Sequence, residues 1–384
     1  MKAEGAKGKA NRNARRSSRA APARRTAPAT VPRSEFDFIK RIRQRAQRAA
    51  DALTASPSAL LTGIGDDAAV LAQQADRDTL ITTDLLVEDI DFRRATTTAR
   101  ALGHKALAVS LSDMAAMGAR PRWALLSVGV PAAIWRTRFL DDFYAGFFAL
   151  AARTGVCLVG GDVSRTPERI VVDSIVLGET ARGRAVLRNG ARPGDQIFVT
   201  GTLGGAAAGL HILEAGLPVG RTSSTTSRSA PSARRRPATA RARLVQRQRQ
   251  PEPRLGWGAL LGADRLATAM IDLSDGLSSD LAHLCAASGV GALIDAALIP
   301  VDPFITQTGV AAEDALALAL HGGEDFELLF TVRPQHAARV PQAVAGVPVT
   351  RIGAVRARKA GLKMMSGGRT GTLKPAGFTH FGAE

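Results

Sequence analysis

Short apolar runs alternate with glycine- and aspartate-containing turns along most of this chain. Strands are predicted at residues 78–83, 123–130, 156–159, 170–177 and 196–200. Helices are predicted at residues 36–52, 99–117, 137–153 and 277–287. The first strand is expected to end at Asp84, and the Pro193-Gly194-Asp195 turn is the expected hinge between two domains. The alternation predicts a mixed α/β (α+β) fold, with domains at residues 35–190 and 191–384.

The positive charge of the chain is concentrated in two segments. The formal net charge is +17, but residues 1–33 and 221–254 contribute nine positive charges each, so the remainder is close to neutral. Both segments are rich in Arg, Ala, Ser, Thr and Pro and poor in large apolar residues, so neither is expected to form a core. We therefore predict a disordered basic tail at residues 1–34 and a basic low-complexity insertion at about 221–250.

Composition and residue spacing disfavour several classes of protein. Neither basic segment carries the interleaved aromatic residues that single-strand binding favours, so nucleic-acid binding is not the expected role. No run approaches the roughly 18 apolar residues of a membrane span. Cys157 and Cys285 lie far apart with no metal or disulfide spacing, which predicts a cytoplasmic protein. The histidines show no metal-ligand spacing and no Ser-His-Asp arrangement, which disfavours nucleophilic catalysis.

Acidic residues recur where the apolar runs break into glycine. They lie in Gly65-Asp66-Asp67, Thr82-Thr83-Asp84, Ser112-Asp113, Gly160-Gly161-Asp162 and Asp272-Leu273-Ser274-Asp275-Gly276. Each motif alone is typical of a turn or a helix cap, although Asp113, inside a predicted helix, needs water, a cation or a donor. Two carboxylates about 4 Å apart repel by roughly 4 kcal/mol, so a fold that gathers them needs cations. Carboxylate and hydroxyl oxygens suit magnesium, and the set therefore predicts a magnesium-dependent phosphoryl-transfer site.

Four longer motifs, taken in order, carry a family resemblance. They occupy residues 62–71, 105–119, 271–277 and 321–328, and the last reads His-Gly-Gly-Glu-Asp-Phe-Glu-Leu. Together they resemble the signatures of the thiamine-monophosphate kinase family. The resemblance implies the fold shared with aminoimidazole ribonucleotide synthetase and selenophosphate synthetase, in which an N-terminal sheet pairs across a homodimer. It also implies transfer of the ATP γ-phosphate to thiamine monophosphate, which yields thiamine diphosphate.

The resemblance further implies roles for individual residues. Magnesium ligands are implied at Asp67, Thr82, Thr83, Asp84, Asp113, Asp162, Asp272 and Asp275. ATP contacts are implied at Gly161, Asp162, Arg188, Ser274 and Tyr144, and substrate contacts at Asp91, Glu324 and Phe378. Asp113 and Arg188 are expected to carry catalysis, because an acceptor phosphate needs positioning and charge neutralisation more than a strong base.

One position departs from the family pattern, and it leaves alternatives open. The family usually has His before Phe where this chain has Asp91-Phe92, and an acid near an anionic substrate repels it unless a metal intervenes. The alternatives are an inactive relative, a basic nucleic-acid-binding protein, or another ATP-using enzyme of the superfamily acting on an aminoimidazole ribonucleotide precursor or selenide. An enzyme acting on selenide is expected to carry a reactive Cys, or its replacement, near the N-terminus, and residues 1–66 contain no Cys.

Overall fold

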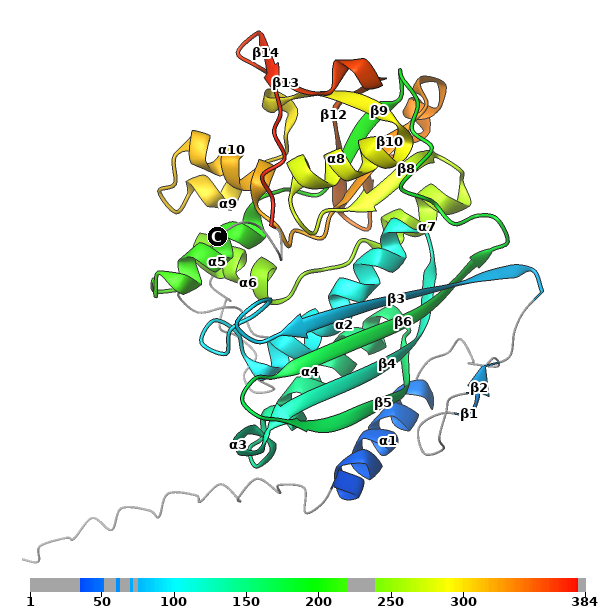
Figure 1. The fold of residues 1–384 in the computed structure, drawn as a ribbon, viewed down its shortest axis with the longest axis vertical. Helices are drawn as coiled ribbons and strands as arrows, with labels where there is room; N and C mark the ends of the chain where they lie inside the picture. The colour runs from blue at the N-terminus through cyan, green and yellow to red at the C-terminus, as the bar shows by residue number, and fades with distance from the viewer. Residues whose placement is uncertain (1–34, 52–59, 63–69, 72–74, 220–238, 379–384) are drawn as a thin grey trace, which may run out of the picture.

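The computed structural model describes residues 35–51, 60–62, 70–71, 75–219 and 239–378. These residues contain two large sheets with their helices and one small two-stranded sheet (Figure 1). The predicted mixed α/β class is confirmed. Among the described residues, no helix is long and apolar enough to cross a membrane.

The first half of the chain forms a four-stranded sheet with helices packed on one face. The strand order is β3-β6-β4-β5, and β4 and β5 are the parallel pair. The strands are β3 (Arg77–Val87), β4 (Arg120–Pro131), β5 (Cys157–Thr166) and β6 (Val171–Ala181). The helices are α1 (Glu35–Asp51), α2 (Ala99–Ala116), α3 (Ala132–Trp135) and α4 (Phe139–Thr154). A separate small sheet pairs β1 (Leu60–Thr62) with β2 (Val70–Leu71).

The second half forms a larger sheet in the order β14-β13-β9-β12-β7-β10-β8, with β11 paired to β12. Its strands are β7 (Gln196–Thr200), β8 (Ala267–Asp272), β9 (Val290–Asp295), β10 (Leu328–Val332), β11 (Ala343–Val344), β12 (Val347–Ala357), β13 (Leu362–Ser366) and β14 (Arg369–Thr372). Its α-helices are α5 (Gly205–Glu214), α6 (Ala240–Arg249), α7 (Leu255–Ala263), α8 (Leu277–Ser288), α9 (Pro303–Thr306) and α10 (Ala312–His321). Three short 3-10 helices are η1 (Ala296–Leu298), η2 (Pro334–Arg339) and η3 (Arg358–Ala360).

Helix α2 joins the two halves. It packs against α4 and the first sheet on one side, and it contacts α7 and β8 of the second half (Figure 1). Glycines let α2 and α4 approach closely, because a Cβ at Gly103 would lie 1.8 Å from the carbonyl oxygen of Phe143. Most of α2 is therefore buried, and Asp113 in its last turn has a fixed position between the two halves.

Two predicted boundaries are wrong. Strand β3 does not end at Asp84, which instead pairs with Ser174 in the middle of the ladder. The low-complexity insertion does not extend to residue 250, because residues 240–249 form helix α6. Leu244 and Val245 of this helix are buried among α5, α9 and α10, and Arg247 forms ion pairs with Asp325 and Glu327, so this basic helix packs on the second half.

Candidate active site

Three carboxylates from separate elements lie within electrostatic reach of one another at the junction of the two halves. Asp84 comes from β3, Asp113 from the last turn of α2, and Asp272 from the end of β8. Two serines of α2 bind the carboxylates of Asp84 and Asp272. Ser110 Oγ donates to Asp84 Oδ2 and Ser112 Oγ donates to Asp272 Oδ2, each at 2.7 Å. The hydroxyls of one helix thus orient carboxylates from both sheets.

Burial and mutual repulsion raise the pKa values of these acids. Burial first, and then the charge of Asp113, raises the pKa of Asp84 to about 6 and that of Asp272 to about 7. Burial also raises the pKa of Asp113, against the opposing effects of a hydrogen bond from Thr82 and the positive charge of Arg188. Carboxylates that resist ionisation near neutral pH gain strongly from a cation among them.

The chemistry of this cluster fits a hard divalent cation. Its polar atoms are carboxylate and hydroxyl oxygens, the ligand type that magnesium prefers. Within the described part of the chain, no three His, Cys, Asp or Glu side chains are close enough to enclose a metal on their own. An open set of carboxylates suits a cation that completes its shell with phosphate oxygens and water.

Other sequence-predicted ligands lie on the opposite face of the first sheet. Thr83 Oγ1 donates to Asp173 Oδ1 at 2.6 Å, and strand alternation turns Thr83 away from its neighbours Thr82 and Asp84. Asp162 pairs in register with Ser127, which pairs with Asp173 on its other side. The structure therefore divides the metal ligands predicted on the first sheet between its two faces.

Gly161 precedes Asp162 at a close approach of two strands. Its φ is +149°, and a Cβ there would lie 2.1 Å from the carbonyl oxygen of Leu126. Any side chain would push β5 away from β4 and would displace the exposed Asp162. Glycine is thus needed here for the backbone, whatever the ligand.

A cavity of about 480 Å³ lies beside the carboxylate cluster, between the two halves. Six of its lining residues were placed in the site from the sequence, namely Asp84, Asp91, Ser274, Asp275, Glu324 and Phe378. Ile90 and Phe378 contribute side chains that are 60% and 50% exposed, which gives the cavity apolar walls. Apolar walls with polar groups at the ends suit a small organic ligand with a charged end.

Glu324 has a constrained position in this cavity. Its φ is +70°, a left-handed value that is costly for a residue other than glycine. Its amide donates to the carbonyl oxygen of Ser274 at 2.8 Å, and its carboxylate contacts Lys105 of α2 and Gln248 of α6. Three elements therefore determine where this carboxylate points.

Comparison with known proteins identifies the family. Residues 65–180 match the family model "AIR synthase related protein, N-terminal domain", and residues 192–363 match its C-terminal counterpart. Thiamine-monophosphate kinase of Escherichia coli K12 is 39% identical over 321 residues, which cover 83% of this chain and 91% of that protein. The chain belongs to the thiamine-monophosphate kinase family.

Solved structures of the thiamine-monophosphate kinase family have the same fold. The Stenotrophomonas maltophilia enzyme matches with a TM-score of 0.72 and 35% identity, covering 86% of this chain and 96% of that one. AaThiL, solved in complex with AMPPCP and TMP, matches with a TM-score of 0.66 and 28% identity, covering 90% and 97%. The expected family membership is confirmed.

At the position that departs from the thiamine-monophosphate kinase pattern, Asp91 has a local structural role. Its Oδ2 accepts a hydrogen bond from the main-chain amide of Val87 at 2.8 Å, and it closes the turn that follows β3. Asp91 also lines the cavity, and its contact with the substrate stays a prediction. Its carboxylate already has a partner, which reduces the repulsion expected from its charge.

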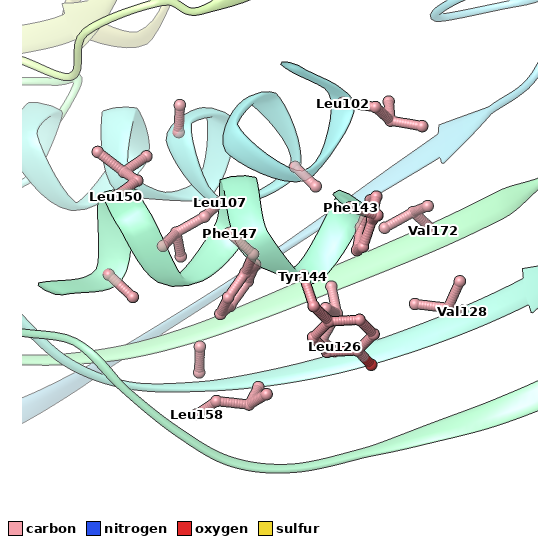
Figure 2. Packing of buried hydrophobic residues seen from close by; sticks show 14 of the residues in the cluster. Leu102, Leu107, Leu126, Val128, Phe143, Tyr144, Phe147, Leu150, Leu158 and Val172 are labelled. Atoms are coloured by element: carbon pink, nitrogen blue, oxygen red, sulfur yellow. The ribbon is translucent and has the colours of Figure 1, made fainter. Parts of the chain in front are cut away.

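One predicted site residue, Tyr144, lies in the core of the first half. Tyr144 packs among Phe143, Phe147 and Phe148 in the core between α4 and the first sheet, and it is only 3% exposed (Figure 2). This packing encloses the Tyr144 ring, and the ATP contact at Tyr144 stays a prediction. Asp67 lies outside the described residues.

Four polar residues that contact predicted site residues were not themselves predicted from the sequence. They are Lys105, Asp173, Gln248 and Asp280. Asp280 accepts hydrogen bonds from the amides of Asp275 and Gly276, and burial is the first cause that raises its pKa to about 8. The position of Asp173 among apolar strand residues was a sequence signal for a functional acid. Gln248 gave no such signal, because it lies in a tract whose composition is typical of low complexity.

Proposed function

We infer that this protein phosphorylates thiamine monophosphate to thiamine diphosphate with ATP as the donor. One observation carries the inference: in a member of the thiamine-monophosphate kinase family, a cavity of a size that suits a small organic ligand is lined by Asp84, which belongs to the carboxylate cluster with Asp113 and Asp272. The relative AaThiL was solved with AMPPCP and TMP. A carboxylate cluster at one end of such a cavity is the arrangement that phosphoryl transfer to a phosphorylated small molecule requires.

The residues of the chain act mainly by positioning and by fixing charge. The acceptor phosphate is already a nucleophile, so no general base is needed. Asp84, Asp113 and Asp272 would hold magnesium, which supplies charge neutralisation at the transferring phosphoryl group. Arg188 is exposed and close enough for its charge to act on Asp113, so it offers a second positive charge at the same place. Ser110 and Ser112 keep the carboxylates of Asp84 and Asp272 oriented.

The remaining site assignments form part of the same proposal. We propose further metal ligands at Asp67, Thr82, Thr83, Asp162 and Asp275, and nucleotide contacts at Gly161, Asp162, Arg188 and Ser274. We propose that Asp91, Glu324 and Phe378 contact thiamine monophosphate. The position of the last three along one cavity supports this grouping.

We also propose that the protein is a cytoplasmic homodimer. The outer face of β3 presents Ile81 and Leu85, which are 68% and 58% exposed, on the sheet that the family resemblance assigns to subunit pairing. Exposed apolar side chains of this size on one strand favour burial against a partner. Two unpaired, buried cysteines are consistent with a reducing compartment.

The direct test is to incubate the purified protein with ATP, magnesium and thiamine monophosphate and to measure thiamine diphosphate. Free thiamine is the matched control, because it lacks the phosphate nucleophile and should not be phosphorylated. Conversion of thiamine to thiamine monophosphate, or no turnover at any magnesium concentration, would contradict the proposed function. Light scattering at several protein concentrations tests the dimer.

A further inference from the structure

The last described residues of the chain form a short strap that reaches the cavity. After β14 the chain is anchored by Leu373, which is buried in the core of the second half, and it then runs along α8 (Figure 1). We call residues 376–378 the C-terminal strap. Phe378 at its end lines the cavity, so the position of the strap determines part of the cavity wall.

Three consecutive main-chain amides hold the strap on the first turn of α8 and on the turn that precedes this helix. The donors and acceptors are Ala376 with Ser278 Oγ at 3.3 Å, Gly377 with Ser279 Oγ at 2.9 Å, and Phe378 with the carbonyl oxygen of Asp275 at 3.2 Å. Every amide of the strap therefore has a partner. These three bonds fix the backbone up to the residue that lines the cavity.

Gly377 allows the strap to lie directly on the turn that carries Asp275. A Cβ at Gly377 would lie 2.2 Å from the carbonyl oxygen of Asp275 and 2.7 Å from Ser279 Oγ. Non-bonded heavy atoms do not approach so closely, so any larger residue must push the strap away from this turn. Asp275 also lines the cavity, so the strap is held by the same turn that contributes a carboxylate to it.

The two serines that hold the strap differ in their other contacts. Ser278 Oγ also bonds with Nδ1 of His321 at 2.8 Å, at the start of the turn that leads to Glu324. Ser279 Oγ lies directly against Gly377, and Ser279 is only 8% exposed, so water competes poorly for this hydrogen bond. A change at Ser279 therefore perturbs the strap and leaves the contact between Ser278 and His321 in place.

We propose that Ser279 is a positioning residue for substrate recognition, because it holds the C-terminal strap where Phe378 contacts the organic part of thiamine monophosphate. Gly377 is a second positioning residue, since glycine lets the strap lie against Asp275. This inference rests on the proposed function. An aromatic side chain offers apolar contact, which suits the rings of the substrate and not its phosphate. Helix α8 thereby takes part in substrate binding.

The test is a double-mutant cycle on Ser279 and Phe378. It measures the KM for thiamine monophosphate, and also the Kd for thiamine monophosphate in magnesium and AMPPCP. Phe378→Ala removes apolar contact and should raise both constants about tenfold. Ser279→Ala removes one hydrogen bond to the strap and should raise them about fivefold. Because both changes act on one contact, the double variant should resemble Phe378→Ala alone, and the KM for ATP should stay unchanged.

Further variants separate positioning from folding. Ser279→Thr keeps the hydroxyl group and should retain the wild-type constants. Gly377→Ala should raise the KM for thiamine monophosphate, whereas Gly371→Ala in β14, where a Cβ would meet no atom within 4 Å, should not. Ser366→Ala at the exposed end of β13 is the matched control for Ser279→Ala. Melting temperatures should change little in all of them, because most of the strap is exposed.

The outcomes are distinct. If the wild-type protein does not phosphorylate thiamine monophosphate, the proposed function fails and this inference fails with it. If it does, an unchanged KM for thiamine monophosphate in Phe378→Ala or in Ser279→Ala overturns the inference while the proposed function stands. Effects of the two substitutions that multiply in the double variant would also overturn it, because Ser279 would then act independently of Phe378.

Discussion

Replacing Asp113 with Asn should stabilise the metal-free protein while removing most of its activity. After burial, the charge of Asp113 is the largest cause of the raised pKa of Asp84 and Asp272. The rise of Asp272 to about 7 from 3.8 corresponds to on the order of 4 kcal/mol, at ~1.4 kcal/mol for each unit. Neutralising Asp113 removes this repulsion, which should stabilise the folded state by on the order of 1 kcal/mol at neutral pH.

The pH dependence of this stabilisation has a definite sign. The pKa of Asp272 is higher in the folded state than in the unfolded state, so the folded state binds more protons between pH 3.8 and about 7. Stability of the metal-free protein therefore falls as the pH rises through this range. The gain from Asp113→Asn should be largest at pH 8, about 2–4 °C in melting temperature, and should shrink at pH 5.

The assay measures melting temperatures in EDTA at both pH values, then in magnesium, together with the rate of thiamine diphosphate formation. Loss of a charged metal ligand should lower the rate on the order of a hundredfold, and magnesium should stabilise the wild type more than the variant. Asp264→Asn, at an exposed position after α7, is the matched control. A variant that melts lower than wild type in EDTA at pH 8, or that keeps near-wild-type turnover at low magnesium, would refute the reasoning.

Three further predictions concern positions outside the cluster. Asp91→His should lower the KM for thiamine monophosphate several-fold in a salt-sensitive way, because a negative charge beside an anionic substrate is removed. It should also cost about 1 kcal/mol of stability, because the amide of Val87 loses its acceptor. A raised magnesium requirement would instead identify Asp91 as a metal ligand. Shortening 222–237 should leave the melting temperature nearly unchanged, whereas Leu244→Ala in the adjoining helix should cost about 2–5 kcal/mol; equal effects would contradict this. Arg254→Met should destabilise by about 3–5 kcal/mol in denaturant titrations, because Glu327 is fully buried, and Arg254→Met with Glu327→Gln should recover much of the loss.

Local sequence determined the fold class and most of the elements of this protein. Apolar periodicity located helix α2 and strand β4 to within a few residues. The reason is that the buried face of a helix or strand recurs at a fixed spacing in the local sequence. It failed at α6, where Leu244 and Val245 are too few to show a pattern in a tract dominated by arginine. Their burial depends on a surface supplied by α5 and α9, which no local window contains.

The ordered acidic motifs also sufficed to indicate phosphoryl-transfer chemistry. What they left undetermined was which acids share a site. Strand alternation and the position of α2 separate Thr83 from Asp84 and bring Asp113 within electrostatic reach of Asp272, 159 residues away in the sequence. Electrostatic interactions and hydrogen bonds depend on distance in space. The pKa values of the cluster were therefore decided by the tertiary structure alone.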